Sequence, residues 1–248
     1  MDASTYNKEI YISEEKFDNL YYEVFTPRIE KAISLLKGFK GTLLDIGCGD
    51  GTISLKIKNS LNCEVKGAEL IQENVVKARK KGIDAKKVDL NNEKLPFKSN
   101  SIDCVFAGEI LEHVVGSEKL LEEMKRVLKK KGILIITVPN TASWYNRMLL
   151  LFGYLPHFIE SGSKQSYGTP FGEINGHVKA FTKRSILEML KGNGFKIEKS
   201  CGTGLGSTKL EKYNTGSLKI LAPLFFIFEK ILSYKTDLAT NIVVKAIK

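Results

Sequence analysis

Short apolar segments alternate with amphipathic segments over the central part of the chain. The amphipathic stretches lie at 51–60, 72–81 and 117–130, and their apolar residues recur with helical spacing. The apolar runs between them are short enough to be strands. Such an alternation predicts a parallel sheet with helices on both faces. The expected strands are 42–46, 64–69, 84–88, 102–107 and 132–138.

The flanking segments extend this prediction to both ends of the chain. Residues 9–38 repeat apolar residues at roughly helical spacing and predict one or two helices that lead into the first strand. Residues 182–193 predict a helix with Thr182 as its N-cap, and 195–201 predict a strand. We expect a mostly apolar helix at about 217–232 and a last strand in the C-terminal TNIVVKAIK.

The helix at 117–130 has the clearest amphipathic pattern. Ser117 is expected to be its N-cap, and Lys131-Gly132 is expected to end it. Its apolar stripe is formed by Leu120, Leu121, Met124, Val127 and Leu128.

Composition indicates the size of the hydrophobic core and the compartment in which the protein is expected. The chain has 248 residues, 43% of them hydrophobic, which is enough for one full core. Its four cysteines are scattered in apolar surroundings without a C-x-x-C pair, which indicates buried free thiols in a reducing compartment. The N-terminus lacks a basic segment followed by an apolar one, and no segment is long enough to span a bilayer. We therefore expect a soluble, cytoplasmic protein.

The net charge of +10 leaves a polyanionic partner open. Much of the positive charge falls in two runs, each expected in the last turn of a predicted helix. Cations there complement the helix dipole and remain solvated, so this structural explanation is favoured over a nucleic-acid surface. The runs are Lys77, Arg79, Lys80 and Lys81, and Lys125, Arg126, Lys129, Lys130 and Lys131.

A glycine-rich loop follows the first predicted strand. In LLDIGCGDG, Gly47, Gly49 and Gly51 alternate before a helix, an arrangement typical of nucleotide sites. The spacing is G-x-G-x-G and not the G-x-G-x-x-G of a dinucleotide site, and Asp45 and Asp50 add negative charge. Carboxylates repel a pyrophosphate but suit a ligand with ammonium and hydroxyl groups. S-adenosylmethionine has both groups and carries no phosphate.

Acidic residues also end the next two predicted strands. Glu69 lies at the distance along the chain expected of an acid that binds ribose hydroxyls. Asp89 can accept a hydrogen bond from an adenine amino group, and Leu90 beside it can pack on the ring. Each acid alone is most simply a solvated loop carboxylate. Together, at successive strand ends, they indicate a nucleoside site.

These segments resemble the class I S-adenosylmethionine-dependent methyltransferases. The matching pieces are LLDIGCGDG, GAEL, VDLNNEKLPFKSNSIDCVFAGEILEHV and LKKKGILIITVPN, and the resemblance covers about residues 40–200. It implies an α/β, Rossmann-like, doubly wound sheet of seven strands, mostly parallel, with NIVVKAIK as an antiparallel last strand. It also implies in-line transfer of the sulfonium methyl group. The expected cofactor-binding residues are Asp45, Gly47, Cys48, Gly49, Gly51, Glu69, Leu70, Asp89, Leu90 and Glu109.

The segment EILEH places Glu109, Glu112 and His113 at positions i, i+3 and i+4. If 109–114 is helical, these three side chains share one face. Two carboxylates and an imidazole can hold a divalent ion such as Mg²⁺ or Mn²⁺, with His177 as a fourth candidate ligand. Without a metal, His113 or His177 can act as general base on a hydroxyl.

Two branches of the methyltransferases resemble this constellation. One comprises O-methyltransferases of quinone biosynthesis. The other comprises metal-dependent enzymes that methylate the 2′-hydroxyl at small-RNA 3′ ends. The second branch is similar at E-x-x-E-H, at the VPN after the fifth strand, and at a later His followed by aromatic-Thr-basic, here His177 and Phe181-Thr182-Lys183.

The segment after the fifth strand is rich in aromatic and apolar residues and is too long for a simple connection. Together with the apolar stretch 224–228 it can line an apolar pocket, touch a membrane surface, or form ordinary core. Few basic residues lie near it. We therefore expect a small apolar or aromatic acceptor, lipid- or sugar-linked acceptors included, methylated on oxygen, with RNA as the second candidate. A non-catalytic module is disfavoured by the acids at 45, 69 and 89.

One domain is expected to use the whole chain, 1–248. Its parts are a helical lead-in (1–39), a cofactor-binding half (40–139), a lid or substrate insertion (140–181) and the C-terminal part of the sheet (182–248).

Overall fold

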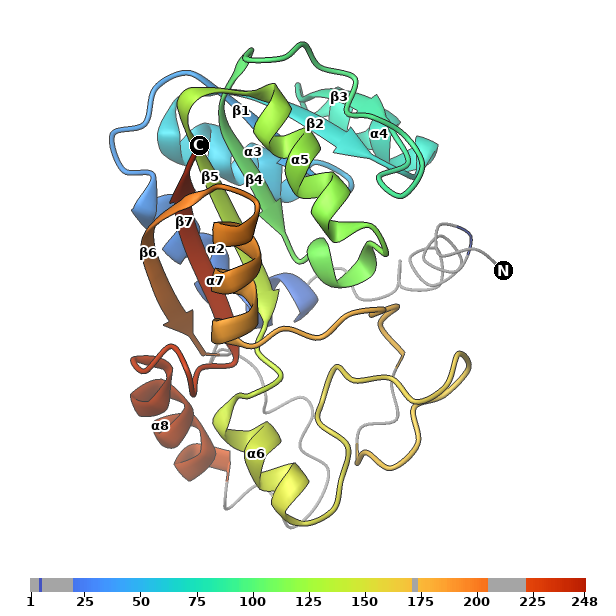
Figure 1. Ribbon diagram of the computed structural model, residues 1–248, viewed down its shortest axis with the longest axis vertical. Helices are drawn as coiled ribbons and strands as arrows, with labels where there is room; N and C mark the ends of the chain where they lie inside the picture. The colour runs from blue at the N-terminus through green and yellow to red at the C-terminus, as the bar shows by residue number, and fades with distance from the viewer. Residues whose placement is uncertain (1–4, 6–19, 171–173, 205–221) are drawn as a thin grey trace.

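A seven-stranded sheet lies between two layers of helices in the computed structural model, which describes residue 5 and residues 20–170, 174–204 and 222–248 (Figure 1). The strands are β1 (Thr42–Ile46), β2 (Glu64–Glu69), β3 (Asp84–Lys87), β4 (Ile102–Gly108), β5 (Leu128–Pro139), β6 (Lys196–Thr203) and β7 (Asn241–Ile247). The main helices are α2 (Leu20–Leu35), α3 (Thr52–Leu61), α4 (Gln72–Lys80), α5 (Ser117–Val127), α6 (Trp144–Leu151), α7 (Lys183–Gly192) and α8 (Ala222–Ser233).

The strand order is β3-β2-β1-β4-β5-β7-β6. β7 runs antiparallel to its neighbours β5 and β6, and the other pairings are parallel. This confirms the predicted Rossmann-like α/β fold with an antiparallel last strand. The order of the strands reverses at β1 and β4, where loops diverge and leave room for a ligand at the carboxyl ends. The fold therefore directs attention to the ends of β1, β2 and β4.

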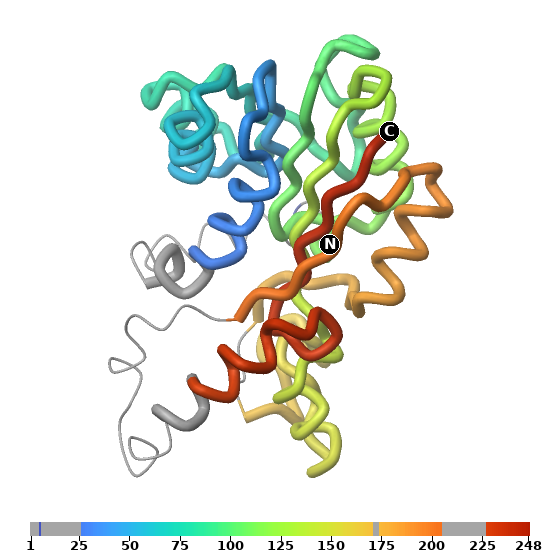
Figure 2. The backbone as a smooth tube through the Cα atoms, turned by 90° about the vertical axis from the view of Figure 1, so that its left-hand side faces the viewer, coloured from blue at the N-terminus to red at the C-terminus, as the bar shows by residue number. Residues whose placement is uncertain are grey.

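Alternate strand residues enter two hydrophobic cores. Leu43 packs with α2, α3 and α4, whereas its neighbour Leu44 packs with α5 and α7. Both side chains are fully buried because the strand is covered on both faces and successive side chains point to opposite sides. Figure 2 shows these two groups of helices on opposite sides of the sheet. The doubly wound arrangement is thus confirmed.

The N-terminal lead-in is helical where the structure describes it. α2 buries Ile29 and Ala32 on the α3 and α4 side of the sheet, and Leu36, just after the helix, is buried there too, which explains the helical spacing of apolar residues. Residues 6–19 lie outside the described part of the chain, as do residues 205–221, which include the start of the helix predicted at 217–232. The remainder of that helix is observed as α8.

The predicted boundary between the third central helix and the fifth strand is wrong. α5 ends at Val127, and β5 begins at the next residue instead of at 132. Leu128 pairs with Ile102 of β4, and a register shift follows before Ile133 pairs with Cys104; Lys131, within this shift, has a left-handed φ of 63°. Lys129, Lys130 and Lys131 therefore belong to β5 and do not complement the α5 dipole, whereas Lys125 and Arg126 lie in its last turn as expected.

The two predicted helix caps have different outcomes. Ser117 is the first residue of α5 and not its N-cap, because its hydroxyl donates instead to the carbonyls of Leu111 and Val114, at 3.1 and 2.8 Å. Thr182 caps α7 as predicted and forms a capping box with Ser185.

The insertion after β5 contains α6 and a long stretch without regular secondary structure, of which residues 171–173 lie outside the description. It leaves and rejoins the body of the protein at one place, where the Thr141 amide donates to the Phe181 carbonyl at 2.8 Å. Within the described residues, no helix is both long and apolar enough to cross a membrane. The four cysteines are free, and Cys48 and Cys104 are buried.

Candidate active site

The loop between β1 and α3 depends on its three glycines for different reasons. All three have left-handed φ angles, of 73°, 53° and 83° for Gly47, Gly49 and Gly51. A Cβ on Gly47 would lie 2.0 Å from the side chain of Ile110, and one on Gly51 would lie 2.9 Å from the Cα of Ala78. A Cβ on Gly49 meets nothing within 4 Å. Gly47 and Gly51 thus permit close packing, while Gly49 lies beside open space that a ligand can enter.

Asp45 lies beneath this loop and is almost fully buried. Its carboxylate accepts a hydrogen bond from the Ser54 hydroxyl of α3 at 2.5 Å. The pKa of Asp45 is raised to about 7, mainly by burial; the Ser54 hydrogen bond lowers it, and the nearby Glu69 carboxylate contributes to the rise. Asp45 therefore ties the end of β1 to the first turns of α3.

Glu69 joins the loop to the end of β2. One carboxylate oxygen accepts from the Gly49 amide at 2.9 Å, and the other accepts from the Ile71 amide at 2.8 Å. Burial raises the pKa of Glu69, and these backbone donors oppose the rise. In a phosphate-binding loop the backbone amides must point at the ligand. Here an acid already occupies the Gly49 amide, which disfavours a phosphate in the same place.

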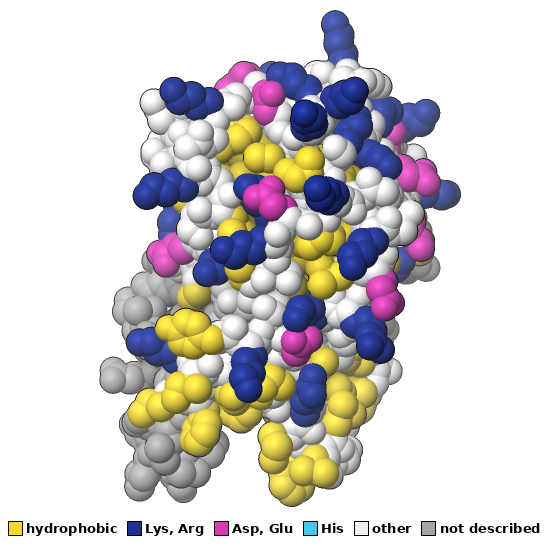
Figure 3. All heavy atoms as spheres, turned by 60° about the vertical axis from the view of Figure 1, so that its left-hand side comes forward, with side chains coloured by type: hydrophobic (Ala, Val, Ile, Leu, Met, Phe, Trp, Pro, Cys, Tyr) yellow, Lys and Arg dark blue, Asp and Glu magenta, His cyan; other side chains and the backbone are white. Residues whose placement is uncertain are grey.

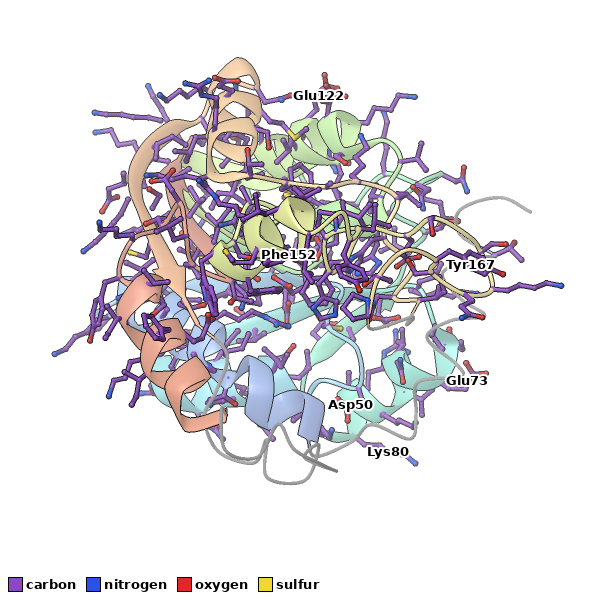
Figure 4. The ribbon with its side chains drawn as sticks, turned by 90° about the horizontal axis from the view of Figure 1, so that it is seen from below. Asp50, Glu73, Lys80, Glu122, Phe152 and Tyr167 are labelled. Carbon is purple, nitrogen blue, oxygen red and sulfur yellow. The ribbon has the colours of Figure 1, made fainter. Side chains whose placement is uncertain are left out.

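Asp50 has a different role from the one expected of it. Its carboxylate forms an ion pair with Lys81, at the C-terminal end of α4, and accepts from the amide and hydroxyl of Thr52 at 3.0 and 2.9 Å (Figure 4). The Lys81 ammonium offsets the negative charge that the sequence suggested for the loop. Asp50 thus anchors the start of α3.

Asp89 and Leu70 line an open hollow of about 430 Å³ beside the end of β2. Lys87, Asn92 and Glu93 complete its lining. Asp89 accepts hydrogen bonds from the amide of Asn91 and the side chain of Asn92, both at 2.9 Å. Leu90 is not one of the lining residues and packs against the hydrophobic core that contains Leu44 and the apolar face of α5. The hollow thus brings together Leu70 and Asp89, two of the residues predicted to bind the cofactor.

The EILEH segment is not the helix that its spacing suggested. Glu109 has a left-handed φ of 56°, and only Leu111–His113 form one short turn of 3-10 helix, η2. Glu109 turns toward β5, where its carboxylate accepts from the Thr137 hydroxyl at 2.7 Å. Its other oxygen lies 3.7 Å from the guanidinium of Arg28 in α2. A strained non-glycine residue at the end of a central strand is a common feature of functional sites.

Glu112, His113 and His177 converge below η2, with one ligand atom from each within 4.8 Å of the others. The end of the insertion brings His177 to Glu112 and His113, because the amides of Val178 and Lys179 both donate to the Glu112 carbonyl, at 2.8 and 3.0 Å. Glu109, the first of the three candidates in EILEH, is not part of this group. Three of the four candidate ligands are therefore brought together, through a tertiary contact and not through a helical face.

Both imidazoles of this cluster are oriented by backbone carbonyls. Nδ1 of His113 lies 3.1 Å from the carbonyl of Gly176, and Nδ1 of His177 lies 3.1 Å from that of Phe158. A proton on each Nδ1 leaves Nε2 as the basic nitrogen. Burial lowers the pKa of His113 to about 3 and also lowers that of His177. Both rings are thus neutral at neutral pH.

The carboxylate of Glu112 is fully buried, and neither of its oxygens has a hydrogen-bond partner among the described residues. Burial raises the pKa of Glu112 well above its usual value, and the nearby Glu109 carboxylate adds to the rise. Buried carboxylates are costly unless they are hydrogen-bonded, paired or bound to a metal. The donor set, one carboxylate and two imidazoles, suits Mn²⁺ or another transition ion better than Mg²⁺, which prefers oxygen ligands.

Two residues of this region were not predicted from the sequence. Arg28 is buried, and it brings a positive charge from the lead-in helix to Glu109. His157, in the insertion, stacks on Phe158 with ring centroids 3.8 Å apart, and Phe158 in turn lies 5.5 Å from the His177 ring. Burial lowers the pKa of His157 to about 4. A buried arginine in an amphipathic helix and a lone histidine in a loop give no periodic signal.

The sheet order, the acid-bound glycine loop and the carboxyl-edge site define a Rossmann-like methyltransferase fold. The Methyltransferase domain family matches residues 44–136. A crystal structure of a S-adenosylmethionine-dependent methyltransferase from Thermotoga maritima, described as a possible histamine N-methyltransferase, superposes with a TM-score of 0.66. The two are 17% identical, and the match covers 98% of this chain and 99% of that one.

Two relatives are similar in sequence. An uncharacterized protein of Methanocaldococcus jannaschii is 29% identical over 80% of this chain and 79% of its own. Demethylmenaquinone methyltransferase of Staphylococcus aureus is 31% identical over 53% of this chain and 56% of its own. Over residues 44–136 the chain therefore matches the methyltransferase domain family, and its fold is that of the S-adenosylmethionine-dependent methyltransferases, as the resemblance implied.

Proposed function

We propose that this methyltransferase transfers a methyl group to an oxygen of a small apolar or aromatic acceptor. One observation carries the proposal. The imidazoles of His113 and His177, both neutral at neutral pH, meet with ring centroids 4.7 Å apart beneath the apolar insertion. A neutral imidazole is the group best suited to accept a hydroxyl proton near neutral pH.

The residues at the carboxyl edge suit S-adenosylmethionine. We assign Gly47, Gly49 and Gly51 to the methionyl part, with Asp45 and Glu69 beside the ammonium group and the ribose. Asp89 and Leu70 line the hollow assigned to the adenosine end. When bound, the cofactor supplies an electrophilic methyl group on a sulfonium, whose leaving group needs no protonation. The protein's part is to hold the acceptor oxygen in line and to remove its proton.

His113 is the first candidate for that proton transfer, with His177 as the second. Each ring is held in place by a carbonyl on its Nδ1, which directs a basic Nε2 into the cluster. The pKa of His113, about 3, makes it a weak base in the empty protein. A nearby negative charge developing on the acceptor oxygen would strengthen it.

The acceptor class follows from the insertion. Phe158 and His157 stack next to His177, and the neighbouring insertion residues Leu149, Leu155 and Ile159 are half-buried. Aromatic rings favour a flat or apolar partner. The similarity to demethylmenaquinone methyltransferase, which is named for a quinone substrate, supports this class.

The test uses isotopically labelled S-adenosylmethionine and a panel of phenols, catechols and prenylated quinols, with products identified by mass spectrometry. We expect an O-methyl product from at least one apolar phenol. His113→Gln should lower turnover by about a hundredfold while leaving cofactor affinity, measured by calorimetry, unchanged. Methylation only on nitrogen or carbon would contradict the oxygen assignment, and failure to bind the cofactor would contradict the site.

A second candidate is a metal-dependent 2′-O-methyltransferase acting on RNA 3′ ends. The partnerless buried carboxylate of Glu112, together with His113 and His177, favours it, because a divalent ion would satisfy that carboxylate. A bound ion would lower the pKa of an acceptor hydroxyl. Electron paramagnetic resonance of added Mn²⁺ tests the site directly, and Glu112→Gln should abolish the bound signal. Salt-sensitive retention on short RNA would support the acceptor, and full turnover in excess chelator would reject this candidate.

A further inference from the structure

The large exposed hydrophobic residues are concentrated on two neighbouring elements. α6 and the residues after it expose Leu150, Leu151, Phe152 and Tyr154, with Leu151 and Phe152 at 73% and 70%. α8 and the residue after it expose Ile227, Phe228, Ile231 and Tyr234, the last at 82%. Away from these two helices and the insertion, the large hydrophobic residues that the structure describes as exposed are Val76 and Val115.

α6 and α8 are fastened together, so their exposed faces belong to one end of the molecule. The Trp144 indole of α6 donates to the buried carboxylate of Glu229 in α8. The Trp144 amide donates to the Leu238 carbonyl, just after α8, at 2.9 Å. Both helices lie beyond the carboxyl ends of the strands (Figure 1). Figure 3 shows hydrophobic side chains gathered at this end, with Lys and Arg side chains beside them.

The charges on these helices have one sign. The exposed charged side chains described on α6 and α8 are Arg147 and Lys230. After α8, Lys235 is exposed, and so is Asp237, whose carboxylate pairs with Lys183 at 2.8 Å. The acidic residue of α8, Glu229, is buried. Tyrosines at the margin, Tyr154 and Tyr234, combine an apolar ring with a polar tip. Apolar side chains, basic side chains and peripheral tyrosines together are the composition of a surface that lies in a lipid–water interface.

We propose that the face formed by α6, α8 and the residues that follow each helix, the α6–α8 face, docks on an anionic lipid surface. A second copy of the chain is the other natural occupant of an apolar face. A two-fold interface would bring the same patch of each copy together, and so would place Arg147, Lys230 and Lys235 against one another. The described exposed residues of the two helices offer no carboxylate to compensate them, and the carboxylate of Asp237 after α8 already pairs with Lys183. Like charges in an interface oppose association. Anionic headgroups supply the missing counter-charge.

α6, which forms part of the α6–α8 face, belongs to the insertion that also carries His177 of the His113 and His177 cluster. Docking would therefore bring the acceptor side of the site to the membrane, where apolar acceptors partition. The docking does not depend on which atom is methylated or on which histidine takes the proton. It is a property of the outer surface and can be tested without turnover.

Flotation of the full chain with vesicles is the test. The vesicles contain equal parts of phosphatidylcholine and phosphatidylglycerol, or phosphatidylcholine alone. We expect flotation with the anionic vesicles and much less with the neutral ones. Leu151→Ser/Phe152→Ser and Ile227→Ser/Phe228→Ser should each weaken anionic-vesicle binding by about tenfold or more. Val76→Ser/Val115→Ser is the matched control, because it removes two exposed valines from other surfaces, and it should bind like the unaltered chain.

Cofactor affinity, measured by calorimetry, confirms that each variant is folded, and it separates this proposal from the proposed function. Three results would overturn lipid docking. The first is an unaltered chain that stays with the soluble fraction. The second is a loss of vesicle binding in the valine control equal to that in the other two variants. The third is a concentration-dependent dimer that both α6–α8 variants abolish, which would assign the face to a second copy.

Discussion

The carboxylate of Glu69 accepts a hydrogen bond from the amide of Gly49 at 2.9 Å, and so joins the end of β2 to the glycine loop that follows β1. The acid and the loop form one unit, with the Ile71 amide as a second donor at 2.8 Å. A negatively charged group already satisfies the loop amide that a phosphate would need. This relationship gives a structural reason for a cationic, phosphate-free nucleoside ligand.

Glu69→Gln should weaken S-adenosylmethionine binding by about tenfold to a hundredfold. The amide keeps one acceptor oxygen but replaces the other with a donor, which would face the Gly49 or the Ile71 amide. The measurement is calorimetric titration with the cofactor. Glu73→Gln, on the exposed face of α4, is the control and should bind normally (Figure 4). Equal affinities for the two variants would remove Glu69 from the site.

The glycine loop allows steric and conformational effects to be separated. Gly51→Ala should destabilise the fold by about 2–4 kcal/mol, because a left-handed alanine would also press on the Ala78 backbone. Gly38→Ala provides the comparison, since Gly38 has a similar φ of 81° and nothing within 4 Å of an added Cβ. It should cost only about 1 kcal/mol. Urea unfolding measures both, and equal losses would show that close packing at Gly51 contributes nothing.

The pKa of Asp45 predicts a pH dependence of stability. Its value of about 7 lies above the ordinary 3.8, so between these pH values the folded protein holds a proton that the unfolded chain releases. Stability must then fall as pH rises through this window, by about 1.4 kcal/mol per pH unit and roughly 4 kcal/mol in total. Asp45→Asn keeps an acceptor for the Ser54 hydroxyl and cannot ionise.

Urea unfolding of Asp45→Asn at several pH values between 4 and 8, the range set by this linkage, should therefore show stability rising relative to the unaltered chain as pH increases. Asp84→Asn, at an exposed carboxylate paired with Lys66, is the matched control. If Asp45→Asn and Asp84→Asn share one pH profile, Asp45 is ionised in the folded protein and the assigned direction is wrong.

Much of the fold could be predicted because the strands are short and buried on both faces. Leu43 and Leu44 read as a continuous apolar run, and each nevertheless serves a different core. The prediction at 129–131 was wrong because lysines are good helix formers, whereas these residues lie in the register shift between the β4 pairings of Leu128 and Ile133. Helix propensity can be estimated from the local sequence, but the partner strand cannot.

The candidate site was only partly predictable for a related reason. Glu112 and His113 share a short motif, but His177 arrives through the end of the insertion, and its place depends on hydrogen bonds from Val178 and Lys179 to the Glu112 carbonyl. Arg28 reaches Glu109 from a helix that precedes the sheet. Contacts between segments so far apart follow from topology, and no spacing rule within one segment reveals them.

The buried carboxylate of Glu112 predicts a conflict between stability and function. Glu112→Met removes two buried oxygens that lack partners within the described structure, and should raise the free energy of unfolding in chelator by about 1–3 kcal/mol. The same variant should lose any stabilisation by added Mn²⁺. Glu122→Met, at an exposed position of α5, should change stability by less than about 0.5 kcal/mol. A destabilised Glu112→Met would mean that the carboxylate is satisfied in solution.

Two ion pairs with the same separation should contribute very differently to the free energy of unfolding. Arg28 and Glu109 are 3.7 Å apart with side chains 4% and 11% exposed, and Lys56 and Glu30 are also 3.7 Å apart, with side chains 44% and 64% exposed. Arg28→Met leaves the Glu109 carboxylate in a dry environment and should cost about 3–5 kcal/mol. Lys56→Met should cost at most about 1 kcal/mol, because water and salt screen the exposed pair.

A double-mutant cycle completes this comparison. Adding Glu109→Gln to Arg28→Met should recover part of the loss, because the second change removes the charge left without its buried cation. Adding Glu30→Gln to Lys56→Met should leave stability nearly unchanged. Thermal unfolding of all variants, without cofactor, gives both coupling energies. A coupling of the buried pair no larger than that of the surface pair would mean that Arg28 and Glu109 do not interact in solution, and α2 would then contribute packing alone to the site.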